Sequence, residues 1–315
     1  MKFFIDTHAH LNEQSLYSKR EEIINNAIKE NVKRIFCVGY DIESSKRAIE
    51  ISNKFEIVYA IIGIHPNSID EIDKIGEIEE LLENEKVIGI GEIGLDFYWN
   101  KFSEDKQIEA FKKQLEIAQH YQLPVILHLR DVKNSFKAFE IALDILKEYN
   151  LKSVVFHSFS ANEEIAQKIL DRNYYISFSG MILYKNPHIQ NALKITKLKN
   201  VFFETDSPYL VPPHLKGEMN QPKNVKFVYQ KASEILNISI DEVIEKTFYN
   251  VDRCFNLKER EMKHLFEWVY DNERITEDLT DEEAKEFYRN LEKKIESYYD
   301  QGFLISEIKR EILKT

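Results

Sequence analysis

Short apolar runs of β-branched and aromatic residues recur as far as Asp206, separated by segments with the spacing of amphipathic helices. The runs are nearly continuous, which is typical of parallel strands that are buried on both faces. Eight such strands alternating with helices within about 250 residues predict an α/β fold, a (β/α)8 TIM barrel. The predicted strands are Phe3–Asp6, Arg34–Val38, Ile57–Ile62, Val87–Gly91, Pro124–His128, Ser153–His157, Tyr174–Phe178 and Val201–Asp206.

The pattern changes after Cys254, where no further strand is predicted. Met262, Leu265, Phe266 and Val269 form an apolar stripe at helical spacing, and Thr280 begins a capping-box sequence before a second stripe. We therefore predict a barrel of the metal-dependent hydrolase type over residues 1–256 and an all-helical C-terminal extension over residues 257–315. An extension packed on the barrel is favoured over a separate module that binds a partner.

Composition restricts the classes of protein that fit. Hydrophobic residues make up 43% of the chain and charged residues 31%, which is ordinary for a soluble globular protein. No apolar run approaches the roughly 18 residues of a membrane span, and no secretory signal pattern is found. Two cysteines are too few for a disulfide framework, which favours the cytoplasm. The net charge of −11 argues against a broad basic surface for nucleic acid.

Histidines and carboxylates gather where the predicted strands end. His8 and His10 follow the first strand, and residues at i and i+2 of an extended segment point the same way. Carboxyl ends of barrel strands form the face on which active sites lie. Each residue alone has a plain structural interpretation, such as Asp206 serving as a helix N-cap. The six residues of this set are His8, His10, Glu92, His128, His157 and Asp206.

Four imidazoles and two carboxylates exceed the three or four ligands of a single catalytic zinc. The number suits two divalent ions that share one bridging carboxylate and together activate a water molecule. Taken together, the six residues favour a metal centre over six unrelated structural roles. The type of ligand leaves zinc, magnesium and manganese open.

The chain resembles the TatD family of metal-dependent DNases, within the amidohydrolase superfamily, over about residues 3–256. The similarity rests on motifs in the order that the family shows. They are Phe4–Leu11 (FIDTHAHL), Gly63–Pro66 (GIHP), Gly91–Trp99 (GEIGLDFYW), Leu123–Asp131 (LPVILHLRD), His157–Ser160 (HSFS), Tyr175–Gly180 (YISFSG) and Glu204–Leu210 (ETDSPYL).

The resemblance implies a role for each member of the set. His8 and His10 would hold one metal, Glu92 would bridge, and His128 and His157 would hold the second. Asp206 would bind the first metal and orient or deprotonate the attacking water. The resemblance makes Glu92 and Asp206 the expected catalytic residues.

Three residues are expected to contact substrate. His65 can donate a hydrogen bond to a phosphate, or it can hydrogen-bond to the backbone of its own loop. Arg130 can pair with a phosphate or with a neighbouring aspartate. Lys216 lies near the position at which family members commonly carry an arginine, and a lysine grips phosphate without the bidentate fork. Tyr98 and Trp99 can stack on a base or simply cover the mouth of the barrel.

The resemblance implies a 3'–5' exonuclease-like deoxyribonuclease with DNA as its partner and no membrane, and the acidic net charge favours single strands or strand ends. One alternative is another two-metal hydrolase, with a lactone, phosphotriester or amide substrate. Another is a barrel scaffold that recruits a partner, or dimerises, through residues 257–315.

Overall fold

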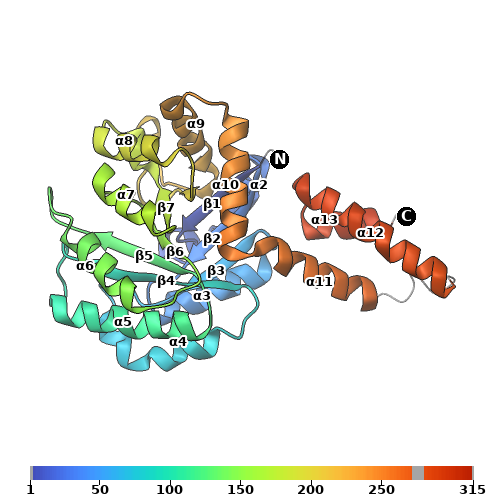
Figure 1. Cartoon of the computed structure of the whole chain (residues 1–315), viewed down its shortest axis with the longest axis horizontal. Coiled ribbons are helices and arrows are strands. Elements are labelled where there is room, and N and C mark those ends of the chain that lie inside the picture. Colours follow the sequence, from blue (N-terminus) through green and yellow to red (C-terminus); the bar gives the residue numbers. More distant parts are fainter. Residues whose placement is uncertain (1–2, 272–279, 314–315) are drawn as a thin grey trace.

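Eight parallel strands form one sheet in a computed structural model, with the strand order following the sequence (Figure 1). The structure describes residues 3–271 and 280–313. The sheet curls into a nearly closed barrel, so the predicted (β/α)8 TIM barrel is confirmed. The strands are β1 (Phe4–Ala9), β2 (Val32–Val38), β3 (Val58–Ile62), β4 (Val87–Asp96), β5 (Val125–Arg130), β6 (Val154–Phe156), β7 (Tyr175–Phe178) and β8 (Val201–Phe203).

Helices cover the outside of this sheet. The helix over Glu163–Asp171 begins after its N-cap Asn162, whose side chain accepts from the Ile165 N–H at 3.0 Å. The helices of the barrel are α1 (Gln14–Tyr17), α2 (Arg20–Lys29), α3 (Ile42–Lys54), α4 (Ile75–Leu81), α5 (Glu104–His120), α6 (Lys137–Ile145), α7 (Glu163–Asp171), α8 (Pro187–Thr196), α9 (Val225–Leu236) and α10 (Ile240–Phe255).

The first and last strands meet beyond the end of β8. The Asp206 N–H donates to the carbonyl oxygen of His8 at 2.9 Å, and the His10 N–H donates to Ser207 at 2.7 Å. The predicted eighth strand ends early, at Phe203, and Asp206 adopts a left-handed backbone with φ of 54°. The seam of the barrel thus brings together three residues of the predicted metal set.

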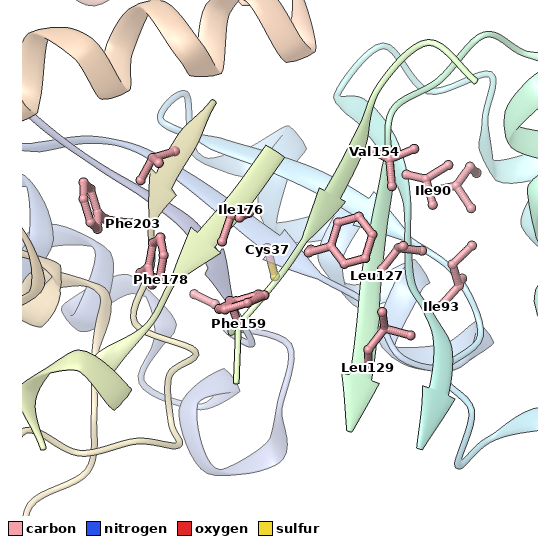
Figure 2. Packing of buried hydrophobic residues seen from close by; sticks show 14 of the residues in the cluster. Cys37, Ile90, Ile93, Leu127, Leu129, Val154, Phe159, Ile176, Phe178 and Phe203 are labelled. Atoms are coloured by element: carbon pink, nitrogen blue, oxygen red, sulfur yellow. The ribbon is translucent and has the colours of Figure 1, made fainter. Parts of the chain in front are cut away.

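Apolar side chains fill both faces of the sheet, as the continuous runs predicted. Leu127, Val154 and Phe178 belong to the layer between strands and helices (Figure 2). Their neighbours along the strands, such as Ile126 and Val155, belong to a second cluster inside the barrel. Because strand side chains alternate between faces, both layers are expected from parallel strands. Both cysteines are buried and free.

In its described residues, the C-terminal extension forms the helices α11 (Leu257–Asp271), α12 (Asp281–Asp300) and α13 (Ile305–Ile312) beside the barrel (Figure 1). The predicted capping box at Thr280 is present at the start of α12. The apolar stripes turn inward, since Leu265, Val269 and Ile295 are buried. These side chains continue the cluster that fills the inside of the barrel. Contact with a partner or dimerisation through residues 257–315 stays a prediction.

Polar contacts also join the extension to the barrel. Lys33 lies 3.2 Å from Glu307, and the Ser306 hydroxyl donates to Glu56 at 2.6 Å. Lys33 and Glu56 lie near the amino ends of β2 and β3. The extension therefore packs at the end of the barrel opposite the histidines. Within the described residues, no helix has both the length and the apolar character of a membrane span.

Candidate functional site

The inner face of the barrel changes from apolar to polar along each strand. His128 lies two residues after Ile126, and His157 lies two residues after Val155, so each histidine continues the inward-facing row of its strand. Apolar side chains fill the barrel toward the amino ends of the strands, and imidazoles and carboxylates occupy the carboxyl ends. Strand periodicity therefore directs these polar side chains toward one another.

His8, His10, Glu92 and Asp206 converge on one point. The two Nε2 atoms of the histidines lie 3.3 Å apart, and each lies 3.7 Å from Glu92 Oε2. Asp206 Oδ1 lies 3.9 Å from the His8 nitrogen and 3.5 Å from that of His10. The structure thus brings these four predicted residues together, and it shows no helix that Asp206 caps among the described elements.

Glu92 faces a second group with its other oxygen. Its Oε1 lies 2.7 Å from His128 Nδ1 and 2.8 Å from His157 Nε2. Two clusters of donor atoms close enough to hold an ion therefore share Glu92, one with His8 and His10 and one with His128 and His157. The carboxylate lies between the two histidine pairs, with one oxygen toward each.

Further contacts orient the imidazoles through the ring nitrogens that face away from the cluster. His10 Nδ1 donates to the carbonyl oxygen of Val38 at 2.9 Å, which directs its Nε2 toward the cluster. His157 Nδ1 lies 3.1 Å from Glu204, and its opposite nitrogen faces Glu92. Such partners fix the tautomer and ring orientation of metal-binding histidines.

Gly94 brings β4 against β5 beside the second pair. A Cβ atom there would lie only 2.3 Å from the carbonyl oxygen of His128. Its φ of +136° also lies where side chains are strained. A glycine is therefore required for the close approach of the two strands that carry Glu92 and His128.

The charges of the site are strongly coupled. Burial alone would raise the pKa of Glu92, but the charge of His157 and the hydrogen bond from His128 lower it well below its usual range. Burial likewise opposes ionisation of Asp206, whereas its bond to His10 and the neighbouring histidines hold its pKa low. Both carboxylates are therefore anionic at neutral pH in a largely buried site.

The donor set fits a divalent metal. A tetrahedral ion with bonds of about 2.1 Å separates its ligand atoms by about 3.4 Å. The spacings of 3.3–3.9 Å among His8, His10, Glu92 and Asp206 lie close to that value. Imidazole nitrogen and carboxylate oxygen are also the ligands that zinc and related ions take.

The three residues expected to bind substrate differ in how near they lie to the cluster of histidines and carboxylates. His65 lies beside the cluster, with its Nε2 3.9 Å from Glu92 and its Nδ1 accepting from the Asn67 N–H at 3.0 Å. Arg130 stacks over the ring of Tyr98 at 4.2 Å, and no ion pair to an aspartate is found for it within the described residues. Lys216 is exposed, and no side-chain contact in the described part of the chain joins it to the cluster.

Two buried carboxylates of the site were not singled out from the sequence. Glu204 accepts from the Ser158 N–H at 2.7 Å as well as contacting His157. Asp96 lies 3.2 Å from His128 Nε2 and accepts from the N–H groups of Tyr98 and Trp99. Each carboxylate lies next to or within an apolar strand run in the sequence. A carboxylate buried in such a run needs hydrogen-bond partners, and this is the signal by which sequence reasoning could have found both residues.

Comparison with known proteins identifies the family. Residues 5–256 match the family model described as TatD related DNase. The chain belongs to this family. It is 36% identical over 259 residues to the metal-dependent hydrolase YabD of Bacillus subtilis, covering 80% of this chain and 98% of that one. It is 31% identical over 255 residues to the metal-dependent hydrolase MJ1582 of Methanocaldococcus jannaschii, covering 80% and 96%.

Solved structures agree with this assignment. The TatD homologue YjjV of Escherichia coli K12 superposes with a TM-score of 0.73 at 26% identity, over 80% of this chain and 98% of that one. An organophosphorus hydrolase from Deinococcus radiodurans superposes with a TM-score of 0.58 at 10% identity, over 80% and 92%, a likeness of fold alone. The protein is thus a metal-dependent hydrolase of the TatD family.

Proposed function

We propose that the protein is a two-metal phosphodiesterase that hydrolyses DNA from strand ends, with 3'–5' exonuclease-like polarity. The position of Glu92 is the main support, because its two oxygens face two separate histidine pairs. A carboxylate in that position suits two cations that share one ligand. The TatD related DNase family supports the choice of DNA.

The predicted ligands divide between two ions. His8, His10 and Asp206 would hold the first, His128 and His157 the second, and Glu92 both. Zinc, magnesium or manganese bound there would polarise a phosphoryl oxygen and stabilise the charge that develops on it. The negative charge of the buried carboxylates would offset that of the two cations.

Asp206 is the proposed proton acceptor. Its side chain is partly exposed at the mouth of the barrel and, since its pKa is lowered, it is ionised at neutral pH. An ionised carboxylate can orient a water molecule by accepting one of its hydrogens, and can take its proton as a phosphodiester is attacked. His10 contacts the same carboxylate and holds it toward the cluster.

Residues around the mouth of the barrel would contact the substrate. His65 can donate from Nε2 to a phosphate, while the guanidinium of Arg130 and the exposed rings of Tyr98 and Trp99 offer charge and stacking surface. The net charge of −11 disfavours a grip on long duplex, which favours single strands and ends. Two buried free thiols suit the reducing cytoplasm, where we expect the enzyme to act.

The test is cleavage by the metal-reconstituted protein of single-stranded DNA labelled at either end. We expect stepwise loss of nucleotides from the 3' end and weak action on duplex. The same preparation is offered lactones, an amide and a phosphotriester. Faster hydrolysis of one of these than of a phosphodiester would replace the proposal with the other two-metal hydrolase. Absence of any hydrolysis by metal-loaded protein would favour a scaffold.

A further inference from the structure

A cavity of about 730 Å³ lies between the barrel and the C-terminal helices. Arg34, Glu56 and Lys86 line it from the amino ends of β2, β3 and β4, and Arg260 and Lys309 line it from α11 and α13. It therefore lies at the opposite end of the strands from the histidine cluster. Its volume is within the range of about 300–1,000 Å³ that is usual for small-molecule sites.

Three cations of this cavity have no carboxylate within 4.0 Å in the described residues: Lys86, Arg260 and Lys309. The acidic residues of the lining are mostly engaged. Glu261 pairs with Arg34 and Glu56 accepts from Ser306, whereas Glu85 lies 3.4 Å from His264, and Glu83 is exposed. The lining carries five basic side chains, including Arg34 and Lys54, against four carboxylates, which is an excess of one positive charge.

Backbone carbonyl groups are a weak substitute for an anion at two of these cations. Lys86 Nζ donates to the carbonyl oxygen of Glu56 at 3.0 Å, and Arg260 reaches that of Val87 only at 3.4 Å. Burial lowers the pKa of both side chains, which means that their charges are incompletely compensated. An anion in the cavity would relieve this cost.

We propose that this cavity is a second binding site, which takes a small molecule bearing a phosphate group. A guanidinium and two ammonium groups converge from two parts of the chain, and these are the groups that proteins use to bind phosphate. Residues 5–256 match the family model, so the wall built from Arg260 and Lys309 lies beyond the family's barrel. The site would therefore be particular to chains with this extension.

A tryptophan beside the cavity provides a local readout. Trp268 on α11 lies under Lys309, whose Nζ is 4.9 Å from its ring, whereas the other tryptophan, Trp99, lies at the mouth of the barrel. In a full-length Trp99→Phe background, Trp268 fluorescence reports on this end alone. The probes are inorganic phosphate and deoxyadenosine monophosphate, with deoxyadenosine as the uncharged control.

We expect a saturable change in Trp268 fluorescence with both phosphate-bearing probes and none with deoxyadenosine. Arg260→Gln and Lys86→Gln should each weaken binding by at least about tenfold, because a charged hydrogen-bond partner is lost. Lys263→Met is the matched control on α11, since Lys263 is exposed and pairs with Glu267. Circular dichroism and the unliganded Trp268 spectrum show which variants retain the fold.

Three results would overturn the proposal. They are no fluorescence change up to millimolar phosphate, an equal response to deoxyadenosine, and unchanged affinity in folded Arg260→Gln and Lys86→Gln proteins. Because the readout does not depend on hydrolysis, failure here leaves the proposed nuclease activity standing.

Discussion

Arg34 and Glu261 form an ion pair of 2.6 Å that is buried between the barrel and α11. Burial alone would lower the pKa of Arg34, but the Glu261 charge raises it above its ordinary value. Tyr59 donates a hydrogen bond to the other oxygen of the same carboxylate. The extension is thus joined to β2 by a buried charge pair and to β3 by the hydrogen bond from Tyr59.

Neutralising Glu261 is expected to be more damaging than removing both charges. Glu261→Gln leaves Arg34 buried without its counter-charge, which costs about 3–5 kcal/mol of unfolding free energy. Arg34→Met/Glu261→Met should recover most of that loss, since an apolar pair of similar volume replaces the ions. Urea unfolding measures both.

The control for this prediction is the exposed pair Lys46–Glu77, which has a similar separation of 2.8 Å. Glu77→Gln should leave the unfolding free energy nearly unchanged because water screens an exposed pair. Equal stabilities of Glu261→Gln and Glu77→Gln proteins would show that the buried pair does not hold the extension in place.

Removal of the extension after Leu257 is expected to leave a folded barrel that still cleaves a small chromogenic phosphodiester. All six predicted metal ligands precede Ser207, and the match to the family model covers residues 5–256. The cut uncovers the apolar cluster around Phe255, so solubility should fall. A soluble, metal-loaded truncation with no activity on that substrate would mean that the extension contributes to the active site.

Asp206→Asn keeps the shape of the side chain but removes its charge and basicity. If Asp206 accepts the proton of water, kcat should fall by about 10²-fold or more, and DNA binding should change far less. Steady-state kinetics and a binding assay with a single-stranded oligonucleotide separate the two effects. Asp144→Asn, at an exposed residue of α6, serves as the control, and a loss of only a few-fold at Asp206 would remove it from the mechanism.

Asp96 is expected to act as a positioning residue. It holds His128 and also the turn that carries Tyr98 and Trp99. Asp96→Asn should lower metal affinity or activity by about 10–100-fold, the usual effect of losing such a contact. Metal titration distinguishes this role from a purely structural one, in which the fold would weaken while metal affinity stayed unchanged.

The sequence was sufficient to predict the barrel and the six clustered residues, because parallel strands leave continuous apolar runs and their carboxyl ends meet at one face. His8, His10, His128 and His157 could be found in this way. Glu204 and Asp96 could not, since their roles depend on which histidine each contacts across neighbouring strands. Lys216 was predicted to bind substrate from its position in a family motif, but in the structure its loop leaves the side chain exposed and away from the cluster.

The cavity and the Arg34–Glu261 pair also lay beyond sequence reasoning. Helical stripes showed that residues 257–315 must pack, but amphipathic periodicity does not say against what. Arg34 stands in a strand run like any other charged residue, and its partner lies 227 positions away. Only the fold shows that the extension covers the amino ends of β2 and β3.

The metal content of wild-type and Glu92→Ala proteins tests the central claim most directly. Elemental analysis of reconstituted protein should give two divalent ions per wild-type chain. Without the shared carboxylate two nearby cations would repel, so Glu92→Ala should lose at least one ion together with its phosphodiesterase activity. A Glu92→Ala protein with two ions and wild-type turnover would contradict the account.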